Sequence, residues 1–141
     1  MKLLLAVLCF ILLVVNCASA SAGILLNVDG KVYHVDTEEN ITVREILERL
    51  PLKLDMTRYA GHEYFAELQF RPKSSSEKRT SQLKAGGIYY WSGGNSFVIN
   101  FKDYNIAPYN SVYLGIVKEV ESLCAYLREA GENVSVSVLT E

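Results

Sequence analysis

Apolar and polar residues alternate along most of the chain beyond residue 23, and this period of two restricts the fold more than any other feature. Side chains two residues apart lie on one face of a strand, so each alternating segment predicts a half-buried antiparallel strand. The alternating segments are residues 24–28, 31–36, 52–57, 64–70, 97–102, 112–116 and 134–138. The Asp29-Gly30 pair between the first two segments predicts a two-residue hairpin turn. The chain is therefore expected to be mainly β.

Two segments have the spacing of helices instead. In the first, Thr42 and Glu45 form a capping box, and apolar residues follow at helical spacing before Pro51 ends the helix. The second helix is expected over residues 119–130. Its apolar stripe consists of Val120, Leu123, Cys124 and Leu127. Each stripe has to be buried, so both helices are expected to pack on a larger apolar core.

About eight strands and two short helices in roughly 120 residues predict a single domain, residues 21–141. Closing the sheet removes the exposed edges that an open sheet would have to protect. The predicted fold is therefore a closed eight-stranded barrel whose ends are capped by the two helices. The polar stretch from Arg71 to Gln82 interrupts the pattern and is expected to form a solvated, mobile loop.

The first twenty residues have the layout of a secretory signal peptide. Lys2 provides a positive start, residues 3–15 form an uncharged apolar run, and Ala18-Ser19-Ala20 has the small residues of a cleavage site. The apolar run is shorter than the about 20 residues that cross a bilayer. We therefore expect residues 1–20 to be removed and the domain from Ser21 onward to be secreted or periplasmic, without contact with a membrane. A lipid anchor on Cys17 is the alternative.

Cysteine content and charge narrow the possible partners. Cys9 and Cys17 lie in the export segment, which leaves Cys124 alone in the expected domain and excludes an internal disulfide there. Residues 1–20 contain Lys2 and no acid, so the net charge of −2 becomes −3 after their removal. A mildly acidic domain without a basic run favours neither nucleic acid nor an anionic membrane as a partner.

Two triplets match the acceptor pattern for N-glycosylation, at Asn40 and at Asn133. Each is followed two residues later by a hydroxyl residue. They are candidate modification sites if the host glycosylates exported proteins. Each asparagine also has an ordinary structural use in a turn or a helix cap.

A series of short motifs runs through the domain in a fixed order. It comprises Leu50-Pro51-Leu52, Tyr59-Ala-Gly-His-Glu-Tyr64, Gly87-Ile-Tyr-Tyr-Trp91, the Gly93-Gly94-Asn95 turn, residues 96–101 and Tyr113-Leu-Gly-Ile-Val117. Together these motifs resemble the cyclophilin-like domains of microbial proteins of unassigned function. The resemblance covers most of the domain and implies a closed eight-stranded barrel with helices at its ends.

The same resemblance argues against the isomerase activity of true cyclophilins. Those enzymes carry an arginine in a Phe-His-Arg signature, whereas the nearest segment here, residues 61–65, has an acid and an aromatic. Arg58 is close in sequence but does not align with the catalytic position. The Ser-Gln-Phe-Phe signature of the proline pocket corresponds here to residues 95–98, Asn-Ser-Phe-Val. Without a donor at the prolyl amide, the rotation barrier of about 20 kcal/mol would be lowered little.

Aromatic residues give the best indication of a binding site. Tyr89 and Tyr90 are neighbours on one strand, so either Tyr90 or the pair Tyr89 and Trp91 lies outside the barrel interior. An outer aromatic beside the polar segment 103–110 would line a groove for a peptide or a sugar. The candidate ligand-binding residues are Arg58, Tyr64, Tyr89, Trp91, Phe97 and Phe101. Ordinary packing between the sheet and a helix is the alternative reading of these aromatics.

The remaining chemistry-bearing residues form no motif. His34 and His62 lack the spacing of a local metal site and are interpreted as surface histidines. Asp55, Glu63 and Glu67 lie at polar strand positions, where carboxylates are expected to be solvated rather than paired for glycoside chemistry. No catalytic residue, metal or cofactor is therefore expected.

Three functions remain open from the sequence. The first is an exported, non-catalytic cyclophilin-like domain that binds a peptide or small molecule through an outer aromatic groove. The second is a degenerate or unconventional peptidyl-prolyl cis-trans isomerase acting on exported chains. The third is a simple surface-interaction module.

Overall fold

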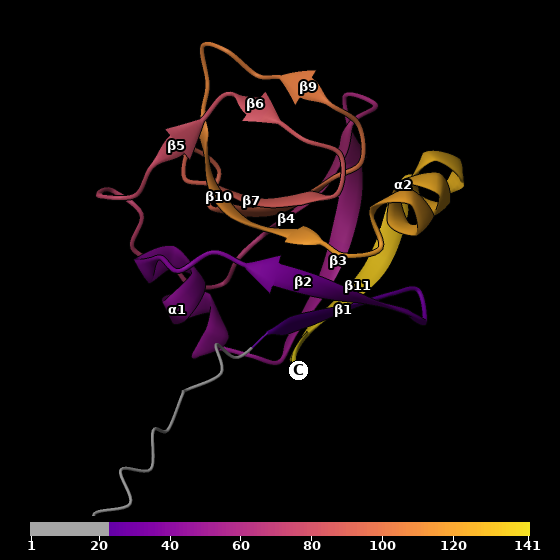
Figure 1. Ribbon diagram of the computed structural model, residues 1–141, viewed down its shortest axis with the longest axis horizontal. Helices are drawn as coiled ribbons and strands as arrows, with labels where there is room; N and C mark the ends of the chain where they lie inside the picture. The colour runs from indigo at the N-terminus through magenta and orange to yellow at the C-terminus, as the bar shows by residue number, and fades with distance from the viewer. Residues whose placement is uncertain (1–22) are drawn as a thin grey trace, which may run out of the picture.

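The computed structural model describes residues 23–141, so the predicted signal peptide, residues 1–20, and Cys17 lie outside the described residues. Eight antiparallel strands close into a barrel (Figure 1). In order around the barrel they are β2 (Lys31–Thr37), β1 (Ile24–Val28), β11 (Asn133–Thr140), β3 (Leu52–Tyr59), β4 (Glu63–Glu67), β8 (Ser96–Asn100), β7 (Gly87–Trp91) and β10 (Ser111–Val117). Pairing of β10 with β2 completes the ring. The predicted closed eight-stranded barrel is confirmed.

The first hairpin shows why alternation predicts these strands. Along β1, buried residues alternate with half-buried ones. Val28 lies opposite Lys31, and the two residues between them, Asp29 and Gly30, have φ angles of 49° and 91°. Positive φ at both central positions is what a tight hairpin turn of this kind requires. The predicted Asp-Gly turn is confirmed.

Two helices lie on opposite sides of the barrel (Figure 1). Helix α1 spans Ile41–Leu47, and helix α2 spans Val120–Glu129. Helix α2 buries Leu123, Cys124 and Leu127 in the barrel core, which confirms the predicted apolar stripe. Within residues 23–141, neither helix has the length and hydropathy needed to cross a bilayer.

The start of α1 differs from the predicted capping box. Asn40 is the N-cap, and its Oδ1 accepts a hydrogen bond from the backbone N of Val43 at 2.8 Å. The hydroxyl of Thr42 donates to the carbonyl of Lys73 at 2.6 Å, and the carboxyl of Glu45 accepts from the backbone N of Lys73. The Thr42 and Glu45 side chains, which the capping box would have used at the helix start, therefore bind the backbone of Lys73 instead.

The polar segment from residue 71 to residue 82 is mostly exposed or half-buried, as expected of a solvated loop, but it also contacts the barrel. Its strand β5 (Arg79–Thr80) pairs with β10. The guanidinium of Arg79 donates to the carbonyl of Ser74 and to the hydroxyl of Ser92, both at 3.0 Å. The segment has few apolar residues to pack, so polar contacts attach it instead.

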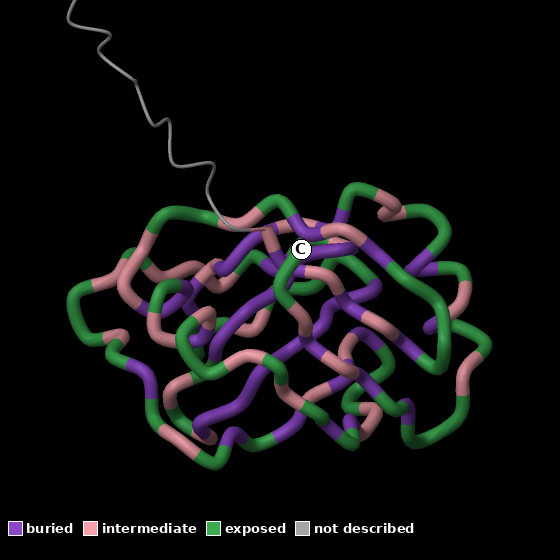
Figure 2. Tube along the Cα trace, turned by 90° about the horizontal axis from the view of Figure 1, so that it is seen from below, coloured by how far each residue is buried: buried purple, intermediate pink, exposed green. Residues whose placement is uncertain are grey.

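A smaller apolar cluster lies outside the barrel core. Strands β6 (Gln82–Leu83) and β9 (Tyr104–Asn105) pair as a separate two-stranded sheet, labelled apart from β7 and β10 in Figure 1. Leu83, Tyr89 and Val98 form the buried centre of this outer cluster. Every residue of β8 is buried, so the half-buried alternation expected there is wrong, because the cover keeps water from the outer face. Buried stretches run through the middle of the molecule, with exposed turns around them (Figure 2).

Candidate functional site

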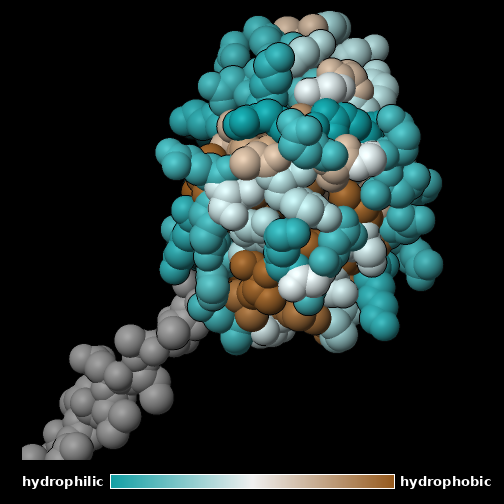
Figure 3. Space-filling model, turned by 90° about the vertical axis from the view of Figure 1, so that its right-hand side faces the viewer, coloured by the Kyte–Doolittle hydropathy of each residue, from teal (hydrophilic) through white to brown (hydrophobic). Residues whose placement is uncertain are grey.

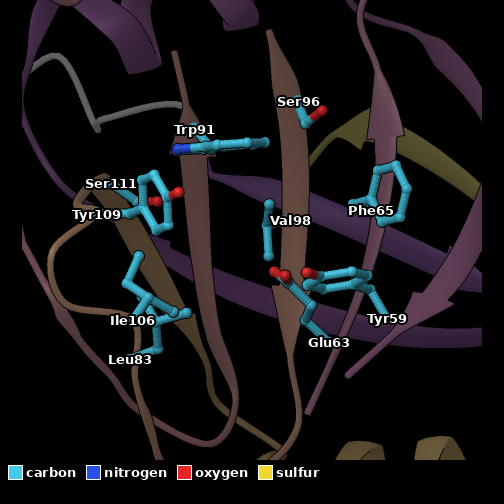
Figure 4. A pocket seen from close by; sticks show the side chains of 10 residues that line it. All are labelled: Tyr59, Glu63, Phe65, Leu83, Trp91, Ser96, Val98, Ile106, Tyr109 and Ser111. Atoms are coloured by element: carbon cyan, nitrogen blue, oxygen red, sulfur yellow. The ribbon is translucent and has the colours of Figure 1, made fainter. Parts of the chain in front are cut away.

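A cavity of about 400 Å³ lies on the outer face of the barrel, beside the segment 103–110 that carries β9. Its walls come from residues far apart in the sequence (Figure 4): Tyr59, Glu63, Phe65, Leu83, Trp91, Ser96, Val98, Ile106, Tyr109 and Ser111. Tyr59, Trp91 and Tyr109 are exposed large side chains at its rim. The cavity therefore opens to solvent between aromatic rings and is closed below by β8.

Two aromatic pairs frame the cavity. The ring centroids of Trp91 and Tyr109 are 6.2 Å apart at an interplanar angle of 80°, and those of Tyr59 and Phe65 are 6.1 Å apart at 90°. Edge-to-face packing of this kind is favourable for aromatic rings. Figure 4 shows Trp91 at one end of the cavity and Tyr59 at the other, with Val98 between them. The volume lies within the range of small-molecule sites in proteins.

The position of Trp91 depends on the turn that follows it. A Cβ atom on Gly93 would come within 2.9 Å of the indole ring, and one on Gly94 within 2.8 Å. Side chains at these positions would push the ring away from the turn. The two glycines, expected as turn residues, therefore also hold one wall of the cavity.

Glu63 carries the single carboxyl group among the residues that line the cavity. Its side chain is 14% exposed. Burial raises the pKa of Glu63 to about 7, and no hydrogen bond within the described part of the chain offsets this effect. In Figure 4 the carboxyl group lies beside the Tyr59 hydroxyl, toward the interior of the cavity. The expectation that Glu63 is solvated is wrong.

His62 is buried behind Glu63, and its hydrogen bond to Asn100 indicates which ring nitrogen carries the proton in the neutral form. The side-chain NH₂ of Asn100 donates to the carbonyls of Lys84 at 2.9 Å and Lys102 at 2.8 Å. The Oδ1 of Asn100 therefore accepts from Nδ1–H of His62, at 3.1 Å. The lone pair on Nε2 of His62 then remains on the side of Glu63, whose Oε1 is 4.0 Å away. Burial also lowers the pKa of His62, so Glu63 has no cationic neighbour at this position.

The prediction that both histidines lie at the surface is correct for His34 and wrong for His62. The side chain of His34 is 43% exposed, and its Nδ1 is 2.6 Å from Oε1 of Glu119. His62 is 1% exposed, because Tyr104 of β9 stacks on its ring with centroids 3.9 Å apart. No group of three metal-ligating side chains gathers anywhere in residues 23–141.

Of the six candidate ligand-binding residues, Trp91 is the one that lines the cavity. Tyr89 lies under the outer cover, where its hydroxyl accepts a hydrogen bond from the backbone N of Lys84 at 2.8 Å. Tyr90 faces the barrel core, while Tyr89 and Trp91 face outward, which confirms the predicted split between these neighbours. The barrel core also contains Tyr64, Phe97 and Phe101.

Arg58, the remaining candidate, lies where α2 covers the barrel and is separate from the cavity. Its Nη1 donates to the carbonyls of Leu127 at 2.8 Å and Ala130 at 3.2 Å. Its guanidinium carbon is 4.8 Å from the ring centroid of Phe101. The bonded carbonyls are at the C-terminal end of α2, where a cation is favourable. The guanidinium donors are therefore used by the helix end and by core aromatics.

Part of the cavity follows from the alternation of side chains along β3 and β4. Thr57 lies opposite Phe65 and Tyr59 opposite Glu63, so the side chains of Tyr59, Glu63 and Phe65 share one outer face of a hairpin. Ile106 and Tyr109 come from the polar segment beside which a groove was expected. Nothing in the local pattern of that segment indicates that it folds over this hairpin face.

The two glycosylation acceptors differ in accessibility. Asn133 is exposed at the start of β11, with its Nδ2 3.3 Å from the hydroxyl of Thr57. Asn40 is half-buried, and both ends of its amide are used, because Nδ2 donates to the carbonyl of Tyr113 at 3.1 Å while Oδ1 caps α1. A glycan on Asn40 would compete with this contact, so Asn133 is the more accessible acceptor.

Comparisons with known proteins agree with this barrel. The model of the cyclophilin-like family matches residues 26–139, so the chain belongs to the cyclophilin-like family. The solution structure of the hypothetical protein AF2241 from Archaeoglobus fulgidus is similar, with a TM-score of 0.61 and 18% identity over 85% of this chain and 95% of that one. None of the curated proteins compared with the chain matches it.

The structure of McbB in complex with tryptophan is also similar. Its TM-score is 0.63 at 11% identity, over 82% of this chain and 44% of McbB. The chain therefore spans less than half of McbB. At identities this low, both solved structures show a shared fold and nothing finer.

Proposed function

We propose that this protein is an exported cyclophilin-like binding domain whose outer cavity takes a small, flat, apolar ligand that carries a protonated amine. One observation carries the proposal. Glu63 places a carboxyl group, with no hydrogen-bond partner or neighbouring cation among residues 23–141, into a cavity walled by aromatic rings. The apolar part of the ligand would fill the cavity, and its positive charge would pair with the carboxylate of Glu63.

The energetics favour such a ligand over a neutral or an anionic one. An ionised carboxyl in apolar surroundings is costly unless a cation or hydrogen-bond donors compensate it. His62 is neutral and directs a lone pair toward this side, so it supplies neither. A protonated amine near Glu63 would also lie close to Tyr59, whose ring face attracts cations. An anionic ligand would instead add repulsion at the same position.

The comparison with McbB suggests the first compounds to test. That protein, which shares the fold, has been determined in complex with tryptophan, a molecule that combines an indole ring with an amine. The cavity here has matching elements, because apolar walls of Trp91, Val98 and Ile106 stand beside one carboxyl group. Arylalkylamines are therefore the class of ligand with which we would begin.

The test compares two ligands of similar shape and opposite charge. The full chain is titrated calorimetrically at pH 8 with tryptamine and with indole-3-propionate. We expect tryptamine to bind at least about tenfold more tightly, a difference of about 1.4 kcal/mol. Glu63→Gln should abolish that preference. Glu67→Gln, an exposed acid on the same strand that does not line the cavity, should retain it.

Equal affinity for the two compounds would contradict the proposal, as would a preference for tryptamine that survives Glu63→Gln. Failure of both compounds to saturate the protein would contradict it too. Trp91→Ala provides an independent check, because the variant should weaken both compounds in parallel by removing one apolar wall while leaving the charge preference in place.

Export is the second part of the proposal, and it is supported by the layout of residues 1–20. Mass spectrometry of the protein recovered outside the cytoplasm of an expressing cell is expected to show an N-terminus at Ser21. A lipid-modified N-terminus at Cys17 would replace secretion by membrane anchoring. Retention of Met1 and the whole apolar run would contradict both alternatives.

A further inference from the structure

The barrel has an open seam between β3 and β4. The two strands pair over three residues, from Thr57 opposite Phe65 to Tyr59 opposite Glu63. On their other sides both strands stay paired for longer, since β3 follows β11 from residue 52 and β4 follows β8 to residue 67. Toward Leu52 the two edges therefore separate, and a groove of about 600 Å³ lies between them.

The β3 edge of this seam carries backbone groups that have no partners within the described residues 23–141. In an antiparallel sheet, successive residues direct their N–H and C=O groups alternately to one neighbouring strand and to the other. The backbone N of Arg58 donates to the carbonyl of Glu132, at the β11 side, at 2.8 Å. Even-numbered residues of β3 thus face β11, and odd-numbered ones face the seam. Lys53 and Asp55 lie beyond the last pair with β4, so their backbone groups face the groove.

The opposite edge has the same property. The backbone N of Leu68 donates to the carbonyl of Asn95, and the Asn95 side chain donates to the carbonyls of Leu68 and Phe70. Even-numbered residues of this stretch therefore face away from the seam as far as residue 70. Glu67 and Gln69 face into it, and β3 offers them no partner at these positions.

We propose that this seam binds an extended peptide segment of another protein, which is added as a strand between β3 and β4 and places a basic side chain between Asp55 and Glu67. An extended polypeptide supplies alternating donors and acceptors to both edges at once, which is how peptides dock on exposed sheet edges. Because β3 and β4 are antiparallel, the added strand would run antiparallel to one edge and parallel to the other.

The charges and the floor of the seam define the peptide further. Continuing the register of β3 and β4 puts Asp55 opposite Glu67, and both side chains are exposed. Arg49 and Lys53 also line the groove, so a basic residue of the peptide is favoured at the Asp55 and Glu67 position in particular, where each edge carries a carboxylate. Leu54 and Leu68 form the apolar floor. The matching peptide therefore alternates apolar residues with polar ones and has lysine or arginine at an outward position.

The probe is a blocked six-residue peptide of alternating valine and threonine in which one central threonine is replaced by lysine. We expect NMR spectra of the full chain to show shifts of the amide signals of Lys53, Asp55, Glu67 and Gln69 on titration. Their hydrogen exchange should slow at least tenfold at saturation. A peptide of the same sequence with every second amide N-methylated, which removes donors to one edge, should bind at least tenfold more weakly.

Charge variants distinguish binding of the peptide in the seam from a general attraction between a cationic peptide and an acidic protein. The double variant Asp55→Asn, Glu67→Gln should lower affinity for the lysine peptide at least fivefold and leave that for an all-threonine version unchanged. Glu129→Gln, an exposed acid on α2, should change neither. Lys53→Pro removes one seam-facing N–H without touching a bond to β11 and should weaken both peptides, with unfolding curves confirming that the variant folds.

Three results would overturn the proposal. The first is equal binding of the N-methylated and unmodified peptides. The second is a set of shifts centred on Trp91 and the outer cavity instead of the seam. The third is concentration-dependent self-association that protects the four seam amides without peptide, which would make a second copy of this chain the occupant.

Discussion

At the scale of single residues, the decisive feature is a carboxyl group whose neighbours do not compensate it. Glu63 is enclosed by aromatic and aliphatic side chains, and His62 behind it has its donor committed to Asn100. Desolvation is thus the cause of the raised pKa of Glu63. Ionisation of such a buried carboxyl is unfavourable, and a cationic ligand beside it would offset this cost.

Replacing Glu63 by glutamine is expected to remove a pH dependence of stability. The pKa of about 7 in the folded protein lies above the ordinary value of 4.5, so the folded state holds an extra proton between these pH values. The free energy of unfolding therefore falls as pH rises through this window, by up to about 3 kcal/mol. Urea unfolding at pH 5 and pH 8 should show the wild-type protein losing stability relative to Glu63→Gln. An identical difference between the two proteins at both pH values would contradict this account.

At the scale of elements, α2 is attached to the barrel through its C-terminal end as well as through its apolar stripe. Arg58 reaches from β3 to carbonyls at that end, and the hydroxyl of Tyr64 on β4 donates to the carbonyl of Gly131 at 2.6 Å. The bonds to Leu127 and Ala130 satisfy carbonyls that a helix terminus leaves without intrahelical partners, and the bond to Gly131 holds the residue after the cap. Arg58 and Tyr64, two residues predicted from the sequence to bind ligand, thus have a clear role in the fold.

Arg58→Ala is expected to lower the free energy of unfolding by about 2–3 kcal/mol, because charged hydrogen bonds to part-buried carbonyls are lost together. Hydrogen exchange should increase first in the last turn of α2. Tryptamine affinity should stay within twofold of the wild-type value, because Arg58 does not line the outer cavity. Loss of ligand binding at unchanged stability would show instead that Arg58 belongs to the site.

At the scale of the whole molecule, closure of the barrel depends on a bulge in β10. Gly115 lies at an irregularity in the pairing of β10 with β7 and opposite Thr37 of β2, where the ring closes. Its φ is 156°, and a Cβ atom there would lie 2.3 Å from the carbonyl oxygen of Asp36. Closure thus requires a residue without a side chain at this one position.

Gly115→Ala should therefore destabilise the domain by at least about 3 kcal/mol, through backbone strain together with the clash at the closing strand. Chemical denaturation gives the magnitude. Gly131→Ala is the matched control, since an added Cβ there meets nothing within 4 Å and φ is not positive. Equal stability of the two variants would show that closure tolerates a side chain at position 115.

The barrel could be predicted from the sequence because its cause is local and repeated. Alternation assigns each strand, Asp29-Gly30 fixes the first turn, and the stripe of α2 has one place to be buried. The site could not be predicted in the same way. Strands β6 and β9 have two residues each and no periodicity, yet their packing buries His62 and encloses Glu63.

The face on the right-hand side of Figure 1 is mostly hydrophilic, with hydrophobic patches separated by polar side chains (Figure 3). Hydrophobic side chains scattered singly over the surface are normal for a folded domain. The outer cavity differs because apolar walls and a buried carboxyl group meet in one place.

The most direct test of the central claim is a ¹³C NMR titration of the Glu63 side-chain carboxyl in the full chain, with and without saturating tryptamine. The account predicts a pKa near 7 in the ligand-free protein, because burial disfavours the charged form, and a lower pKa in the complex, because the ammonium group favours that form. A pKa at the ordinary value of a glutamate, unchanged by tryptamine, would contradict the account.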